Sequence, residues 1–253
     1  RSKNTSITTY GICKLTAIAL RKEDRHTSEM VSQLLYNETY TVLDKSQEWL
    51  LVQTKNGPST DAETYPYQGW IQAKQFSEIS ENEYNELQTA RPYFINKAVA
   101  EHEGHLLSLG TPVYKPHHDA VEMPTRFHPE LLLENAMKLL NAPYLWGGRT
   151  AMGIDCSGLV QVCARMAGLI LPRDASQQVK CGDLVYFLQE TQPGDLAFFG
   201  DEDGHITHVG IIMNDEQIIH ASGQVRIDYL DQSGIFNKVK NEHTDRLQVV
   251  KRL

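Results

Sequence analysis

The feature that most constrains the fold is a change of hydrophobic period in the second half of the chain. Apolar residues at 131, 132, 133, 136, 137, 139 and 140 have the spacing of one helical face. The segment "CSGLVQVCARMAGL" predicts a second helix that begins at Cys156 and ends near Gly168. Five short apolar segments follow: "DLVYF", "GDLAFFG", "THVGIIM", "QIIHAS" and "VRIDYL". This order predicts an α+β domain in which helices pack on an antiparallel sheet.

The first third of the chain has a different pattern, with short strands and polar turns. "TVL", "EWLLVQT" and "YQGWIQA" each predict a strand, and strands at this spacing favour a small β-barrel. The step Gly69-Trp70-Ile71 resembles one that often ends strands in bacterial SH3-like modules. We therefore predict an SH3-like barrel over 1–90, a second, smaller SH3-like unit with a linker over 91–125, and another domain over 126–253.

Charge and hydropathy exclude two classes of protein. The chain carries 24 basic and 32 acidic residues, a net charge of -8, whereas nucleic-acid binders need a basic surface against the phosphates. The charge is compatible with a substrate that bears a cationic group. The sequence contains no run of about 18 apolar residues, so it predicts no membrane span.

Cys156 raises four alternatives: a buried small side chain, half of a disulfide, a metal ligand or a nucleophile. Four cysteines in 253 residues are too few for a disulfide scaffold. Cys163 lies seven residues further along the same predicted helix, about 10 Å away, which is too far for a bridge. We assign Cys163 to the core. The predicted helix N-terminus favours a thiolate at Cys156, the form that acts as a nucleophile.

Two histidines in neighbouring predicted strands supply a candidate base and its orienting partner. His208 begins one apolar strand, and His220 ends the next one, 12 residues later. Paired as a hairpin, the strands bring both rings to one end of the sheet, where His220 can fix the tautomer of His208. His205 also invites a metal site with these residues and Cys156. A catalytic zinc usually has three protein ligands, and Cys156 has no second ligand nearby in the sequence.

At this point the chain resembles the NlpC-type papain-like cell-wall cysteine peptidases. The resemblance rests on five motifs in the same order, over residues 126 to 235: "NAPYLWGGRTAMGIDCSGLVQ", "RDASQQ", "QPGDLAFFG", "HVGIIM" and "IIHAS". With a preceding SH3-like region, it is similar to the subgroup of γ-D-glutamyl-L-diamino-acid endopeptidases that act on peptidoglycan stem peptides. The resemblance implies an α+β papain-like catalytic domain preceded by small all-β SH3-like barrels.

The resemblance also implies roles for individual residues. Cys156 matches the nucleophile, His208 the base, His220 the third catalytic residue and Tyr144 an oxyanion ligand. The implied substrate-binding residues are Asp155, Ser157, Trp146, Arg173, Asp174 and Ser176, together with Glu38 and Tyr67 from the SH3-like part. Among these, Asp155 suits a substrate ammonium, Arg173 suits a carboxylate, and Glu38 with Tyr67 is expected to close the amine end.

The sequence therefore predicts a cysteine endopeptidase that cuts the bond between γ-D-Glu and a diamino acid in peptides with a free N-terminal L-Ala. No cofactor or metal is expected, and the expected partner is the peptidoglycan stem peptide. A non-catalytic wall-peptide-binding protein and a related papain-like amidase or acyltransferase are the alternatives. Because position 1 is Arg, we expect a bacterial envelope protein whose export signal has been removed, with the cytoplasm as the alternative location.

Overall fold

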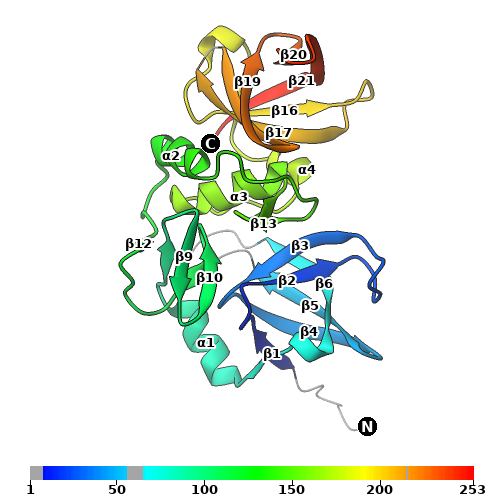
Figure 1. The fold of residues 1–253 in the computed structure, drawn as a ribbon, viewed down its shortest axis with the longest axis vertical. Coiled ribbons are helices and arrows are strands. Elements are labelled where there is room, and N and C mark those ends of the chain that lie inside the picture. The colour runs from blue at the N-terminus through cyan, green and yellow to red at the C-terminus, as the bar shows by residue number, and fades with distance from the viewer. Residues whose placement is uncertain (1–7, 56–64, 215) are drawn as a thin grey trace.

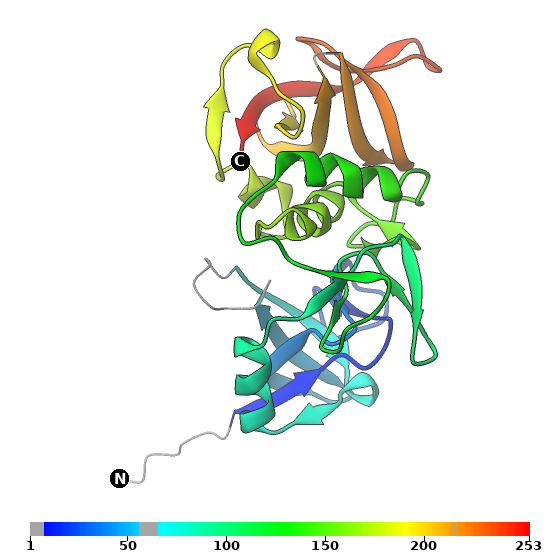
Figure 2. The same cartoon turned by 90° about the vertical axis from the view of Figure 1, so that its left-hand side faces the viewer.

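The structure, a computed structural model, describes residues 8–55, 65–214 and 216–253. Two β-rich bodies are stacked along its long axis, and helices α2, α3 and α4 lie between them (Figures 1 and 2). Among the helices in these ranges, none is long and apolar enough to cross a membrane.

The N-terminal body is a seven-stranded antiparallel sheet with strand order β3-β2-β6-β5-β4-β1-β7. Its strands are β1 (Thr9–Ile12), β2 (Ala17–Arg21), β3 (Met30–Leu35), β4 (Thr39–Ser46), β5 (Trp49–Lys55), β6 (Pro66–Gln72) and β7 (Glu78–Ile79), and the 3₁₀ turn η1 (Ala73–Gln75) follows β6. Alternate residues such as Ile18, Leu20 and Ile71 are buried in one core. Gly69 lets β6 approach Leu20, because a Cβ at that position would lie 2.8 Å from the Leu20 Cβ. The SH3-like assignment of this sheet stays a prediction.

The connection to the second half contains a helix that the strand pattern does not predict. Helix α1 (Glu81–Thr89) begins at Ser80, whose side chain and that of Glu83 form a capping box. Two small sheets follow, with orders β10-β9 and β11-β8-β12. Their strands are β8 (Tyr93–Ile95), β9 (Val99–His102), β10 (His105–Ser108), β11 (Pro112–Val113) and β12 (Ala120–Glu122). Their core residues pack on Tyr36, the residue after β3, in a cluster separate from the core of the first sheet.

The C-terminal body surrounds a buried helix. Helix α2 (Pro129–Lys138) packs on α3 (Cys156–Met166), all of whose residues are buried. The sheet has the order β15-β21-β16-β17-β18-β19-β20, and β20 also pairs with β21. The remaining elements are β13 (Arg149–Thr150), β14 (Gly153–Ile154), α4 (Ala175–Gln178), β15 (Asp183–Val185), η2 (Leu188–Glu190), β16 (Leu196–Gly200), β17 (Ile206–Asn214), β18 (Gln217–Ser222), β19 (Gln224–Leu230), β20 (Gly234–Asn237) and β21 (Glu242–Arg252).

This sheet is antiparallel and carries helices, as the sequence predicts, but it closes on itself. The long strand β21 pairs with β16 at one side and with β20 at the other, which joins six strands in a ring. The prediction missed this closure because "EHTDRLQVVKR" has no simple apolar alternation. The closed sheet holds β17, β18 and β19 side by side, and the site is built on these strands.

Candidate active site

Cys156 is the first residue of the buried helix α3, and the turn before it is tightly held. The Asp155 carboxylate caps the helix by accepting the Gly158 N–H at 2.7 Å. Gly158 has no room for a side chain, because a Cβ would overlap the Gly148 carbonyl oxygen. The Cys156 side chain is therefore fixed at the helix N-terminus, where the backbone N–H groups of the first turn have no partner within the helix.

The two predicted histidines meet, and an acid extends the contact. The ring nitrogens His208 Nε2 and His220 Nδ1 are 2.8 Å apart, and His220 Nε2 lies 2.8 Å from Asp228 Oδ2. His220 pairs with Gly210 in β17, so it lies diagonally from His208 on the same face of the sheet. A Cβ at Gly210 would lie 3.0 Å from the His220 Cβ, so glycine leaves space between the two histidines. Arg226 forms an ion pair with Asp228 on its other side.

Burial keeps both Cys156 and His208 uncharged at neutral pH. It raises the pKa of the Cys156 thiol to about 11, and the Asp155 charge adds to this rise, while backbone N–H groups of Val209 and Ser157 oppose it. Burial, followed by the neighbouring His220, lowers the pKa of His208 to about 4. Burial thus outweighs the helix dipole that the sequence predicts to favour a thiolate. A neutral thiol and a neutral imidazole suit a mechanism in which the imidazole removes the thiol proton as the sulfur attacks.

A cleft of about 480 Å³ opens in front of Cys156. Both β-rich bodies form its walls. A concave site of this size can hold a small ligand. Its lining includes seven of the residues predicted to bind substrate or stabilise the oxyanion: Tyr144, Trp146, Asp155, Ser157, Asp174, Ser176 and Tyr67. The N-terminal body also contributes Lys22, Glu29 and Val31.

One wall of the cleft joins the two bodies by direct hydrogen bonds. The Tyr67 hydroxyl in β6 donates to Asp174 Oδ1 at 3.2 Å, at the start of α4. The Trp146 indole N–H donates to Glu29 Oε1 at 2.9 Å. Burial raises the pKa of both Tyr67 and Asp174, so the Tyr67 hydroxyl keeps its proton and can donate.

Arg173 does not reach the cleft, which corrects the prediction that it meets a substrate carboxylate. Its guanidinium is buried and donates to both oxygens of Asp155, at 3.0 and 2.8 Å. It also donates to the hydroxyls of Ser157 and of Ser32 in the N-terminal body. Asp155 accepts a further hydrogen bond from the Gly147 N–H, so its carboxylate is engaged within the protein although it lines the cleft.

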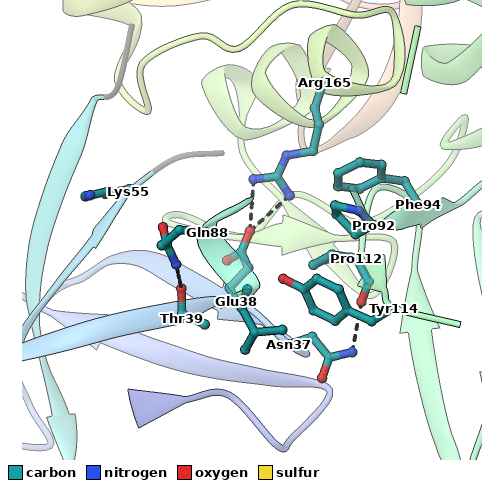
Figure 3. A pocket seen from close by; sticks show the side chains of 11 residues that line it. Asn37, Glu38, Thr39, Lys55, Gln88, Pro92, Phe94, Pro112, Tyr114 and Arg165 are labelled. Carbon is teal, nitrogen blue, oxygen red and sulfur yellow. Dashed lines mark hydrogen bonds and ion pairs between the residues drawn. The ribbon is translucent and has the colours of Figure 1, made fainter. Parts of the chain in front are cut away.

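Glu38 lies away from the cleft, which corrects the prediction that it closes the amine end. Its carboxylate accepts two hydrogen bonds from Arg149, at 2.8 and 3.1 Å, and two from Arg165, both at 3.0 Å. Figure 3 shows the Arg165 side chain reaching down to Glu38, with Tyr114 beside them. Glu38 therefore ties the N-terminal body to β13 and α3.

Sequence reasoning missed two acids that the fold brings to the site. Glu29 lies in the connection between β2 and β3, and no motif marks it. Asp228 does have a signal: in "VRIDYL", Arg226 and Asp228 are two residues apart and so share one face of a strand. Once β18 is paired with β19, His220 faces Arg226, which puts Asp228 on the same face as the histidine.

The metal alternative gains no support at Cys156. Within the described ranges, the groups of three side chains close enough to share an ion are His117 with His118 and Asp119, and Asp201 with Asp203 and His205. Neither group includes Cys156, and His205 pairs with Asp201 instead of joining His208.

Comparison with known proteins identifies the same family that the sequence motifs indicate. The profile of the NlpC/P60 family matches residues 141–243. The gamma-D-glutamyl-L-lysine dipeptidyl-peptidase of Bacillus subtilis is 28% identical over 214 residues, which cover 75% of this chain and 71% of that protein. A probable endopeptidase of Mycobacterium bovis is 37% identical over 107 residues, 41% of this chain and 26% of that protein.

A solved structure extends the likeness over nearly the whole chain. The crystal structure of an NlpC/P60 family protein from Bacillus cereus matches with a TM-score of 0.74 at 20% identity, covering 96% of this chain and 99% of that one. The shared fold therefore includes the N-terminal body as well as the helices and the closed sheet. The papain-like resemblance seen in the sequence is confirmed: residues 141–243 form an NlpC/P60 domain, and the relatives are named as peptidases and endopeptidases, which is consistent with cysteine peptidase activity.

Proposed function

We propose that this peptidase hydrolyses the amide bond between γ-D-Glu and the diamino acid of peptidoglycan stem peptides, and that it prefers peptides with a free N-terminal L-Ala. The observation that carries the proposal is the acidic cleft in front of Cys156, whose lining includes residues of the N-terminal body. The name of the Bacillus subtilis relative, a γ-D-glutamyl-L-lysine dipeptidyl-peptidase, supports the same bond.

The wall of the cleft where the two bodies meet suits an ammonium group. Glu29 and Asp174 both line the cleft, and each accepts a hydrogen bond from an aromatic partner, Trp146 or Tyr67. These bonds hold the carboxylates in place and leave acceptor capacity for a substrate N–H. Glu29 thus takes the role that the sequence predicts for Glu38. Lys22 also lines the cleft, with its ammonium 3.8 Å from a Glu29 oxygen.

Hydrolysis follows the order of a cysteine peptidase. His208 removes the proton of Cys156, whose sulfur attacks the γ-carbonyl carbon of D-Glu. The oxyanion accepts hydrogen bonds from the Cys156 backbone N–H and from the Tyr144 hydroxyl, which burial keeps protonated by raising its pKa. His208 then gives its proton to the leaving amine of the diamino acid. Water, deprotonated by the same imidazole, cleaves the thioester and releases L-Ala-D-Glu.

The proposed substrate is a fragment of the cell wall, which favours a location in the bacterial envelope, either outside the cell or in the periplasm. The direct test is incubation with L-Ala-γ-D-Glu-diaminopimelate, and separately with its L-Lys counterpart, under reducing conditions. Mass spectrometry should detect L-Ala-D-Glu and the free diamino acid. Absence of L-Ala-D-Glu with both peptides would overturn the proposed function.

Replacing Glu29 by glutamine is expected to lower kcat/KM for the free-amine peptide about tenfold, mainly through KM, because one charge-assisted hydrogen bond to the ammonium is lost. Glutamine keeps an oxygen that can accept the Trp146 N–H, so the wall of the cleft is preserved. Glu23→Gln is the matched control, because Glu23 lies on the same connection but pairs with Arg25 at the surface. Equal kinetics of the Glu29 and Glu23 variants would remove Glu29 from the amine site.

A further inference from the structure

Asp228 has no role in the mechanism above, yet it is joined to the base through a continuous set of contacts. Its Oδ2 lies 2.8 Å from His220 Nε2, and His220 Nδ1 lies 2.8 Å from His208 Nε2. His220 is 1% exposed and Asp228 8%, so water has little access to compete with either contact. Three adjacent strands, β17, β18 and β19, each contribute one member of this row.

The chemistry of the acid dictates which atoms carry protons. A carboxylate can only accept hydrogen bonds, so His220 Nε2 must carry the proton of the contact with Asp228. A neutral His220 then has a bare Nδ1, which accepts a hydrogen bond from His208 Nε2. His208 is therefore protonated on Nε2, and its Nδ1 is left bare as the base that takes the proton of Cys156. The opposite tautomer of His220 would leave His208 without a base nitrogen for the thiol.

Arg226 keeps Asp228 in the carboxylate form that these tautomers require. Its Nε lies 2.7 Å from Asp228 Oδ2, and its Nη2 donates to Asp228 Oδ1 at 2.9 Å. Burial alone would raise the pKa of Asp228, but the hydrogen bonds from His220 and Arg226 lower it below its ordinary value. At neutral pH the group is a carboxylate, which also stabilises the positive charge that the histidines carry while the thiol attacks.

We infer that Asp228, held by Arg226, is a positioning residue that fixes the tautomers of His220 and His208 and thereby aims a bare nitrogen at Cys156. This inference rests on the roles proposed for Cys156 and His208. The proposed catalytic row then has five members, in the order Cys156, His208, His220, Asp228 and Arg226.

The variant Asp228→Asn tests the inference. An amide can present either its oxygen or its NH₂ to His220, and an NH₂ there requires the wrong tautomer. We expect kcat/KM to fall on the order of 100-fold through kcat, with KM unchanged because Asp228 does not line the cleft. The matched control is Asp231→Asn, since Asp231 pairs with His243 at the same 2.8 Å but away from the cleft. Equal kcat values for the two variants would overturn the inference.

Two readouts do not depend on the peptide substrate. In ¹⁵N-histidine-labelled wild-type enzyme, NMR should show a protonated Nε2 and a bare Nδ1 for both His208 and His220. A protonated Nδ1 on His220 would contradict the inference, whether or not the variant folds. Alkylation of Cys156 by iodoacetamide, followed by peptide mapping, should be slower in Asp228→Asn, while half-exposed Cys181 reacts at the wild-type rate. If the protein cuts neither stem peptide but gives the expected NMR and alkylation results, the proposed substrate is wrong and the role of Asp228 stands.

Discussion

Replacing Cys156 by alanine is expected to lower hydrolysis of the stem peptide by a factor on the order of 10⁵ or more, because the thioester route is lost entirely. The fold should persist, since alanine at the first position of α3 leaves the Asp155 cap intact. The remaining rate reflects only binding and oxyanion stabilisation. Mass spectrometry of the released products measures the loss of hydrolysis, and circular dichroism checks that the fold persists.

Cys163→Ala is the matched control for this loss. Cys163 lies two turns further along the same helix and is fully buried in the core. Its replacement leaves a small cavity, which should cost about 1 kcal/mol of stability and leave kcat unchanged. A Cys156→Ala enzyme that keeps more than a few per cent of wild-type kcat would show that another group is the nucleophile.

The largest loss of stability is expected from Glu38→Gln. This change removes the carboxylate between two buried guanidinium groups, those of Arg149 and Arg165. Leaving buried charge uncompensated costs about 3–5 kcal/mol, equivalent to a fall in Tm of about 10 °C for a chain of this size. Glu23→Gln, at an exposed ion pair, should change Tm by less than about 2 °C.

The loss of stability caused by Glu38→Gln should become smaller as pH falls. Burial acts to raise the pKa of Glu38, but Arg149 and then Arg165 lower it from 4.5 to about 2. A lowered folded-state pKa means that the carboxylate contributes its full stability above pH 4.5 and loses it as pH falls toward 2. Differential scanning calorimetry should therefore find the widest gap in Tm between wild type and variant above pH 5. A gap that stays constant down to pH 2 would contradict the ion-pair explanation.

Cys156 and the two histidines could be singled out from the sequence as candidates because each lies in a local pattern. Cys156 follows a glycine-rich turn at the start of a helix, and His208 and His220 lie in consecutive apolar strands. Strand pairing needs only a short connection, so their approach follows from local geometry. Asp228 needs one further pairing, between β18 and β19, and this register became known only from the structure.

The acids proposed to bind the substrate amine could not be found in this way, because their positions depend on how the two bodies pack. Glu29 and Glu38 are both acids in the N-terminal third, and local sequence does not distinguish them. Their positions relative to β3 separate them: Glu29 just precedes the strand and reaches Trp146, while Glu38 follows it and faces Arg149.

Helix α1 is a different case, since the capping box formed by Ser80 and Glu83 could have been recognised in the sequence.

The central claim is that the cleft in front of Cys156 selects a free amine. The most direct measurement mixes equal amounts of L-Ala-γ-D-Glu-diaminopimelate and its N-acetylated form with the enzyme and follows both by mass spectrometry. We predict that L-Ala-D-Glu accumulates while N-acetyl-L-Ala-D-Glu does not, because acetylation removes the charge that we propose Glu29 and Asp174 to bind and adds bulk at that wall of the cleft. Release of both dipeptides at equal rates would contradict the account.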